Sequence, residues 1–189
     1  MSFGAHDISK ILVAAHFAAE KHKTQRRKGT QASPYINHPV KVAEILWRVG
    51  EVRDIDCVVA ALLHDTVEDT ATSPSELEKV FGARVRLLVE EVTDDKTLPK
   101  ELRKELQIAH ASHLSDGAKQ IKLADKIANI FDVAFDPAPD WSLERKGDYL
   151  DWATAVVAGL RGCNPKLEAN FDEVLRQARE QVAAVGENR

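Results

Sequence analysis

Apolar residues recur at three- and four-residue intervals along most of this 189-residue chain, which is the spacing of amphipathic helices. The first such segment includes Ile8, Ile11, Leu12 and Ala15. No segment shows the sustained alternation of apolar and polar residues that is typical of a β-strand. We therefore predict an all-α fold that forms a single domain over residues 1–189, with room for one short hairpin.

Start and stop signals divide the chain into helices. Asp7 is the expected N-cap of the first helix, and Pro39 is the expected first residue of the second. Ser73 opens a capping box that Glu76 would complete. Ser115-Asp116-Gly117 is expected to form a turn. The predicted helices span residues 7–23, 40–49, a segment from Asp54 or Asp56 to His64-Asp65, 73–82, 83–92, 100–113, 118–133, 142–160 and 165–185.

The composition excludes several classes of protein. A formal net charge of -4 argues against general nucleic-acid binding, which needs a basic face. No apolar run approaches the roughly 20 residues that a membrane-spanning helix needs. Residues 1–10 lack the continuous apolar stretch of a signal peptide. We therefore expect a cytoplasmic protein with no nucleic-acid or membrane partner, in which Cys57 and Cys163 are reduced packing residues.

The stretch from Ala60 to Thr70 combines a hydrophobic helix with a cluster of polar residues. The apolar run leads directly into His64-Asp65 and, one turn later, into Glu68-Asp69. If the helix continues, residues four apart share a face, so that His64 lies beside Glu68. A solvated acidic helix end is the alternative interpretation. A His-Asp pair at the edge of a core helix, however, suits a divalent cation.

Two further residues could complete a metal site. His38 lies at the entrance of a predicted helix, and Asp125 lies on an apolar helix where an unpaired carboxylate would be costly to bury. Together with His64 and Asp65 they offer two imidazoles and two carboxylates. This ligand set is less thiolate-rich than structural zinc sites and leaves room for water and substrate oxygens. The pattern predicts an open, catalytic site for one divalent ion.

Two groups of cations stand out within the acidic chain. Each group could be a solvated helix end or loop. The position of the first group, just before His38, favours anion binding. The first group comprises Lys21, Lys23, Arg26, Arg27 and Lys28, and the second comprises Lys96, Lys100, Arg103 and Lys104.

A set of motifs relates the chain to a known family. They are His22-Lys23-Thr24-Gln25-Arg26-Arg27-Lys28, Pro34-Tyr35-Ile36-Asn37-His38-Pro39, Ala61-Leu62-Leu63-His64-Asp65-Thr66-Val67-Glu68-Asp69-Thr70, Phe81-Gly82, Glu91-Val92-Thr93-Asp94-Asp95-Lys96 and Lys122-Leu123-Ala124-Asp125-Lys126-Ile127-Ala128-Asn129. In this order, the chain resembles the HD-domain metal-dependent phosphohydrolases. Within them it resembles the RelA/SpoT-type hydrolases of the alarmone (p)ppGpp, especially the stand-alone small hydrolases related to the metazoan SpoT homologue. The motif-bearing part spans about residues 18–152, and C-terminal helices are expected over 142–185.

The resemblance implies roles for individual residues. It makes His38, His64, Asp65 and Asp125 the ligands of one metal ion, usually Mn²⁺, and it assigns the attacking water to Glu68-Asp69 as catalytic residues. The family often has arginine where this chain has Phe131, which leaves one detail of substrate binding or of the residues behind the site open. The implied substrate contacts are Arg27, Lys28, Lys96, Lys100, Asn129 and Tyr149.

The activity implied by the resemblance is hydrolysis of the 3′-pyrophosphate of (p)ppGpp, a small-molecule nucleotide, to GDP or GTP and pyrophosphate. The chain has no room for the synthetase domain of the long family members. One alternative is an HD-type phosphohydrolase that acts on another nucleotide, such as an NADPH phosphatase. A non-catalytic nucleotide-binding module is a second alternative, although such a module would be expected to have lost His64-Asp65 or Glu68-Asp69, and both pairs are intact. A helical scaffold would leave His38 and Asp125 without a purpose. The oligomeric state stays open.

Overall fold

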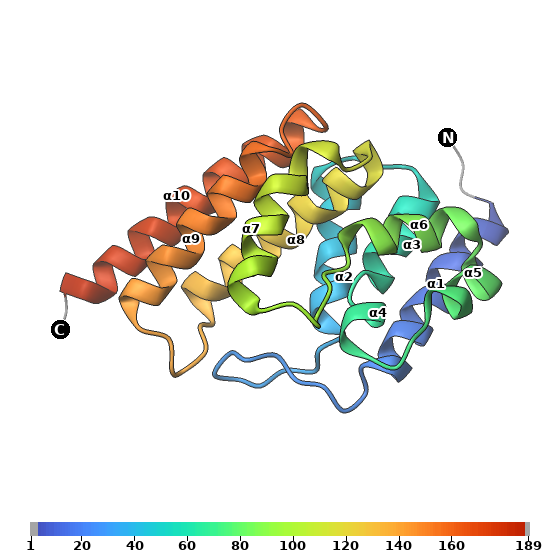
Figure 1. The fold of residues 1–189 in the computed structure, drawn as a ribbon, viewed down its shortest axis with the longest axis horizontal. Helices are drawn as coiled ribbons and strands as arrows, with labels where there is room; N and C mark the ends of the chain where they lie inside the picture. Colours follow the sequence, from blue (N-terminus) through green and yellow to red (C-terminus); the bar gives the residue numbers. More distant parts are fainter. Residues whose placement is uncertain (1–3, 188–189) are drawn as a thin grey trace.

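The computed structural model of the protein describes residues 4–187 and is built from helices (Figure 1). No strand is present within this range, and the prediction of an all-α fold is confirmed. The elements are α1 (Ala5–Lys21), α2 (Asn37–Glu44), the π-helical turn η1 (Ile45–Val49), α3 (Ile55–Leu63), α4 (Thr66–Asp69), α5 (Pro74–Phe81), α6 (Ala83–Val92), α7 (Lys100–His110), the 3₁₀ turn η2 (Ala111–His113), α8 (Asp116–Phe135), α9 (Leu143–Ala158) and α10 (Pro165–Glu187).

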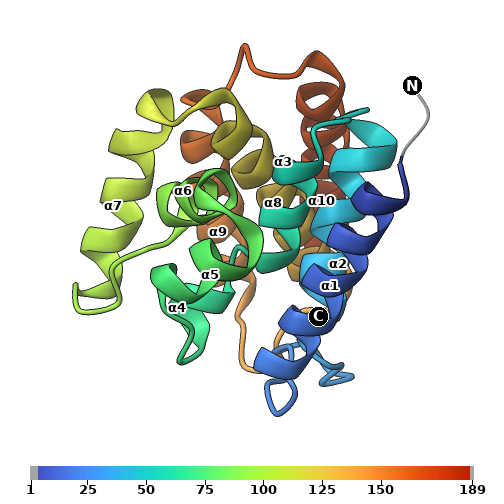
Figure 2. The same ribbon diagram turned by 90° about the vertical axis from the view of Figure 1, so that its right-hand side faces the viewer.

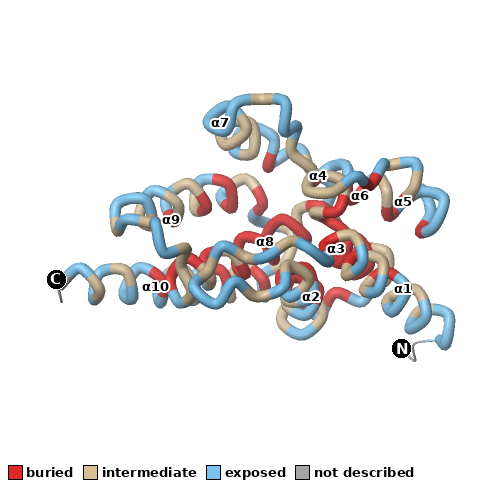
Figure 3. Tube along the Cα trace, turned by 90° about the horizontal axis from the view of Figure 1, so that it is seen from below, coloured by how far each residue is buried: buried red, intermediate tan, exposed pale blue. Residues whose placement is uncertain are grey.

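Helix α8 is the centre of the molecule. It packs against α2, α3, α6, α9 and α10, and every residue from Ile121 to Ala128 is buried. Figure 3 shows this buried stretch crossing the middle of the fold. A helix that is buried all round is normally apolar. The polar residues within this stretch, Lys122, Asp125 and Lys126, therefore need partners inside the protein.

Helix α3 is the second buried element, and it delivers His64 to the interior. The Asp54 carboxylate accepts hydrogen bonds from the backbone nitrogens of Asp56 and Cys57 at 3.1 and 3.4 Å, which fixes the start of the helix. All residues from Cys57 to Leu63 are buried. The apolar rod predicted from the sequence thus ends at His64 in the core.

Several predicted helix boundaries were wrong. Gly4 and not Asp7 precedes α1, and the Asp7 carboxylate instead accepts a hydrogen bond from the Gly4 nitrogen at 3.1 Å. Helix α2 begins at Asn37, so Pro39 is its third residue. Residues 115–117 do not form a separate turn, because Ser115 caps α8. In each case the helix begins two or three residues before the predicted position.

The capping box at α5 forms by half. The Ser73 hydroxyl accepts a hydrogen bond from the Glu76 nitrogen at 3.2 Å, as predicted. The Glu76 carboxylate, however, accepts hydrogen bonds from Lys21 Nζ of α1 at 2.8 and 3.0 Å and does not turn back to Ser73. A tertiary ion pair has therefore replaced the second local hydrogen bond of the box.

The segment between α1 and α2 forms a hairpin-like loop that is closed by a single antiparallel bridge between Arg26 and Pro34. Thr30 Oγ1 donates a hydrogen bond to Asp136 Oδ1 at 2.7 Å, which ties the loop to the end of α8. A Cβ atom on Gly29 would lie 2.2 Å from Asp136 Oδ2, so only glycine fits at this contact. Arg26, Arg27 and Lys28 of the first basic group thus lie on a loop that is anchored beside α8, whereas Lys21 ends α1.

The remaining features bear on earlier expectations. Helix α7 has no buried residue and lies at the edge of the molecule (Figure 2). Cys57 is buried and Cys163 is half-buried, and both are free thiols, as predicted. Among the described residues, no helix is long and apolar enough to span a membrane.

Candidate active site

The four predicted metal ligands come together from three parts of the fold. His38 lies in the first turn of α2, His64 and Asp65 follow α3, and Asp125 lies in the middle of α8. His38 Nε2 is 3.1 Å from Asp125 Oδ1 and 3.7 Å from Asp65 Oδ2. His64 Nε2 is 3.1 Å from Asp65 Oδ2 and 3.8 Å from Asp125 Oδ1. Two imidazole nitrogens and two carboxylate oxygens thus surround one point in the interior.

The chemistry of these donors fits a divalent cation. His64 Nδ1 donates a hydrogen bond to the Ala61 carbonyl at 2.8 Å, which leaves Nε2 to face the two carboxylates. His64 Nε2 is buried and makes no aligned hydrogen bond within the described structure. A histidine whose second nitrogen is held by a carbonyl is the usual arrangement of a metal ligand. His38, His64 and Asp65 also have donor atoms within 4.8 Å of one another.

The electrostatics of the cluster point the same way. Burial lowers the pKa of His38. Burial also acts to lower the pKa of His64, but the charges of Asp65 and Asp125 outweigh it and raise that pKa to about 10. Burial alone would raise the pKa of both aspartates; His64 beside Asp65 and Lys126 beside Asp125 instead hold it below the usual range. Both carboxylates, of the buried Asp125 and the half-buried Asp65, therefore remain ionised and favour a cation between them.

Three neighbouring side chains fix the direction of the carboxylates. The Tyr35 hydroxyl donates to Asp65 Oδ2 at 2.7 Å. Asn129 Nδ2 donates to Asp125 Oδ1 at 2.6 Å, and Lys126 Nζ donates to Asp125 Oδ2 at 3.4 Å. Sequence reasoning did not assign Tyr35 or Lys126 to the site. The available signal was their place in the motifs, three residues before His38 and directly after Asp125.

Glu68 and Asp69 face two different cavities. The chain turns at His64-Asp65 before α4 begins, so α3 does not continue as one straight helix. Glu68 shares a cavity of about 140 Å³ with the four candidate ligands. Its Oε2 accepts a hydrogen bond from the Asp94 nitrogen at 3.2 Å, and burial raises its pKa. Asp69 lines a larger, adjoining cavity.

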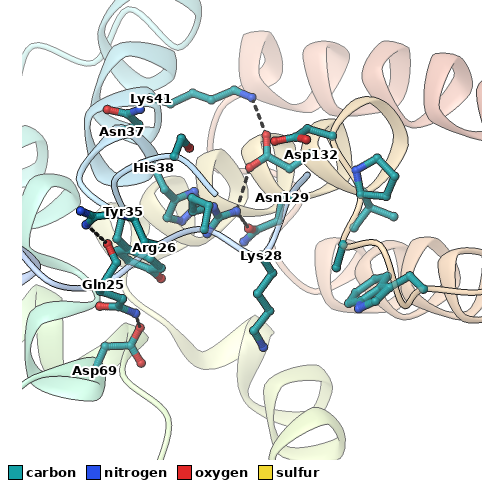
Figure 4. Close-up of a pocket in the computed structure, with 18 of the residues that line it drawn as sticks. Gln25, Arg26, Lys28, Tyr35, Asn37, His38, Lys41, Asp69, Asn129 and Asp132 are labelled. Carbon is teal, nitrogen blue, oxygen red and sulfur yellow. Dashed lines mark hydrogen bonds and ion pairs between the residues drawn. The ribbon is translucent and has the colours of Figure 1, made fainter. Parts of the chain in front are cut away.

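The larger cavity has a volume of about 560 Å³ and opens beside His38 (Figure 4). The loop after α1, the first turn of α2, the C-terminal half of α8 and the residues before α9 form its walls. The predicted substrate contacts that line the larger cavity are Arg27, Lys28, Lys96, Asn129 and Tyr149. Lys100 is exposed at the start of α7 and lines neither cavity.

The cations of the large cavity differ in their surroundings. Arg27 Nη2 donates to Asn129 Oδ1 at 2.9 Å and to Asp132 Oδ2 at 2.8 Å, so its charge is already compensated. Lys96 Nζ forms an ion pair with Asp69. Lys28 is exposed and forms no ion pair with the described residues (Figure 4). Lys28 is therefore the cation most available to a bound anion.

Two aromatic residues lie in or beside the large cavity. Trp141 lines it, although none of the motifs pointed to that role. Phe131, which stands where the family often has arginine, is 41% exposed and does not line either cavity. Lys41 Nζ lies 3.9 Å from the centre of the Phe131 ring. The substitution therefore changes the surface beside the cavity and leaves its walls intact.

Comparison with known proteins places the chain in a family. A family model described as an HD domain matches residues 14–150. The guanosine-3′,5′-bis(diphosphate) 3′-pyrophosphohydrolase MESH1 of Xenopus tropicalis is 54% identical over 168 residues, which cover 89% of this chain and 94% of that protein. The Homo sapiens protein of the same name is 52% identical over 171 residues, which cover 90% and 96%.

A solved structure is also similar to the chain. It is described as a metazoan ortholog of SpoT that hydrolyzes ppGpp and plays a role in starvation responses. It matches with a TM-score of 0.88 and 45% sequence identity, covering 94% of this chain and 98% of its own. With the HD-domain match and relatives that are identical at about half of the aligned positions, the chain belongs to the HD-domain family and, within it, to the group of its MESH1 relatives.

Proposed function

We infer that the protein is a metal-dependent hydrolase that removes the 3′-pyrophosphate of (p)ppGpp and yields GDP or GTP together with pyrophosphate. The observation that carries this inference is the convergence of two imidazoles and two carboxylates at the edge of a cavity that is large enough for a nucleotide and lined by cations. The names of the relatives supply the nature of the nucleotide.

We propose that His38, His64, Asp65 and Asp125 hold one Mn²⁺ ion. Such an ion would polarise the phosphoryl group and lower the pKa of the attacking water. Tyr35, Asn129 and Lys126 hold the ligand carboxylates in the directions that this role needs.

Glu68 is suited to the water because it shares the small cavity with the proposed ligands. Burial raises its pKa, which makes the carboxylate a better proton acceptor near neutral pH. We propose that Glu68 orients and deprotonates the water, and that Asp69 assists from the side of the large cavity.

The large cavity is proposed to bind the substrate through its phosphates and its nucleoside. Lys28 and Lys96 supply positive charge, and Arg27 supplies it once substrate phosphate competes with Asp132. Asn129 and Tyr149 contribute polar and flat surface to the same walls. Lys100 remains a contact suggested by the resemblance alone. Asp132, which pairs with Arg27, and Asp136 line the same cavity and would repel a phosphate arm that approached them.

The wider setting of the protein is also a proposal. The buried apolar residues form one connected core that reaches from Ala14 to Ala178, which supports a single domain over residues 1–189. We propose a cytoplasmic protein that acts on a small nucleotide, and the net charge of -4 supports the exclusion of nucleic acid. We also propose that the protein has no membrane partner.

A nucleotide panel with product identification tests the function. Purified protein with Mn²⁺ is incubated with ppGpp, pppGpp and NADPH in ¹⁸O-labelled water, and the products are separated and analysed by phosphorus NMR. We expect GDP or GTP with intact pyrophosphate, and the label in the pyrophosphate because water attacks phosphorus. Orthophosphate, cleavage of the 5′ arm, or turnover of NADPH alone would refute the proposed reaction.

A further inference from the structure

The carboxylate of Asp69 is held by a chain of two side chains from the segment that follows α1. His22 Nδ1 lies 2.7 Å from Gln25 Oε1, and Gln25 Nε2 donates a hydrogen bond to Asp69 Oδ2 at 2.8 Å. The second contact is drawn in Figure 4. The other oxygen of Asp69 accepts a hydrogen bond from Lys96. Both oxygens of Asp69 therefore meet donors from distant segments of the chain.

The polarity of this chain follows from the groups themselves. An ionised carboxylate can only accept hydrogen bonds, so the amide nitrogen of Gln25 has to face Asp69. The amide oxygen then faces His22 and needs a donor there. His22 must therefore carry its proton on Nδ1. Its Nε2 is buried without a partner in the described structure, and an unpaired lone pair costs less there than an unpaired N–H.

His22, at the far end of these hydrogen-bonded side chains from Asp69, is held rigidly. His22 caps the C-terminus of α1 and is only 2% exposed. Its ring lies against the ring of Tyr35, with centroids 4.8 Å apart and an interplanar angle of 32°. The backbone nitrogen of Gln25 also donates a hydrogen bond to the His22 carbonyl at 2.9 Å, which closes a turn between the two residues. His22 therefore cannot move without disturbing α1 or Tyr35, the tyrosine that holds Asp65.

We propose that His22 and Gln25 are positioning residues that aim the Asp69 carboxylate during hydrolysis. His22 prevents the Gln25 amide from rotating by 180°, and the amide prevents Asp69 from turning fully toward Lys96. This inference rests on the proposed role of Asp69 in the hydrolysis of (p)ppGpp. Nothing in the metal ligands themselves requires either residue.

Removal of the amide is the first test. Gln25→Ala should lower kcat about 10- to 100-fold, the range seen when residues that support a site are removed, with little change in KM and in Tm. Gln31→Ala is the matched control, because Gln31 lies in the same loop and is exposed. In an Asp69→Asn background, Gln25→Ala should cause no further loss. If the loss in kcat of the double variant equals the product of the losses in the two single variants, Gln25 does not act through Asp69.

An isosteric pair tests the proton on Nδ1. The amide nitrogen of asparagine can occupy the place of the histidine Nδ1, whereas that of glutamine reaches the place of Nε2. His22→Asn should therefore retain most of kcat, and His22→Gln should resemble Gln25→Ala. The reverse order with equal Tm values would overturn the proposed polarity.

A charge variant supplies a pH signature that a purely structural role would not produce. In Gln25→Glu, the protonated carboxyl can donate to Asp69, but the ionised form cannot and repels it. The activity of this variant relative to the wild type should rise as the pH falls, while the ratio for Gln25→Ala stays flat. Parallel ratios for both variants would contradict the role of the donor.

A measurement without turnover separates this inference from the proposed function. Long-range ¹H–¹⁵N spectra should show His22 as the Nδ1–H tautomer in the wild type and a changed tautomer population in Gln25→Ala. An Nε2–H tautomer in an active protein would overturn the proposed positioning of Asp69 by His22 and Gln25. The Nδ1–H tautomer in a protein that does not hydrolyse (p)ppGpp would refute the proposed reaction and leave the hydrogen bonds from His22 through Gln25 to Asp69 in place.

Discussion

The two adjoining cavities of this protein are built in different ways. The small cavity takes its ligands from α2, from the end of α3 and from the middle of α8, and the histidines and Asp125 are buried. The large cavity takes most of its cations from a loop and from residues before α7, and Lys28 and Lys96 are exposed. The core thus fixes the proposed reacting centre, and surface segments supply the charge that we propose attracts a substrate. Changes to the small cavity should therefore affect chemistry far more than changes to the large one.

The largest effect is expected from loss of a metal ligand. His64→Ala or Asp125→Ala should remove bound Mn²⁺ and lower kcat/KM by about 10³-fold or more, because a metal ion supplies several kcal/mol of transition-state stabilisation. Metal analysis and steady-state kinetics measure both effects. His16→Ala is the control, since His16 is exposed on α1. Full metal content and activity in both variants would remove the basis of the metal site.

Glu68→Gln should come next, with a loss of at least about 10²-fold in kcat and unchanged metal content, because the variant keeps the shape but cannot accept a proton. Burial raises the pKa of Glu68, so wild-type kcat should fall as the pH drops through that raised value. The acidic limb of the profile should vanish in the variant. Glu105→Gln, at an exposed position on α7, should behave as the wild type. A variant with normal turnover would contradict the role of Glu68.

Tyr35→Phe should weaken Mn²⁺ binding by about tenfold without unfolding the protein, because it removes only the hydroxyl that holds Asp65. A titration of metal-free protein with Mn²⁺ measures the change. Tyr149→Phe is the matched control, because Tyr149 lines the large cavity and not the small one. Equal metal affinities for the two variants would show that the Tyr35 hydroxyl does not support the site.

The smallest effect is expected in the large cavity. Neutralising Arg27 and Lys28 together should raise KM by about fivefold and flatten its dependence on salt, with kcat nearly unchanged, because the exposed Lys28 is screened and Asp132 already offsets the charge of Arg27. Lys79→Ala removes one positive charge from an exposed position on α5 and serves as the control. If KM and its salt dependence do not change, the loop is a solvated surface and the contrast between the two cavities has to be redrawn.

The predicted helix ends were right where the signal in the sequence is local and unambiguous, and wrong elsewhere. The residues of α6 were predicted correctly, because a glycine before the helix and the apolar period within it are local signals. Asp7 and Pro39 were assigned to the wrong helix positions, and Ser115-Asp116-Gly117 was predicted as a separate turn although Ser115 caps α8 and the other two residues begin it. The ends of these three helices therefore lie a few residues from where the local pattern placed them.

The sequence by itself determined the helical character and the residue types that converge on one cation. Both depend on short-range patterns: the apolar period of α3 and α8 sets which residues are buried, and a histidine or an aspartate in such a place needs a partner. The four predicted ligands lie together, as their positions on the predicted helices and the family resemblance led us to expect.

Only the tertiary structure decided how the remaining residues divide between the two cavities. Glu68 and Asp69 are neighbours in α4, yet they line different cavities, and the exposed start of α7 leaves Lys100 outside both. The hydrogen bond from Gln25 to Asp69 joins residues 44 positions apart. Such contacts depend on how whole helices and loops pack, and no local pattern in the sequence specifies them.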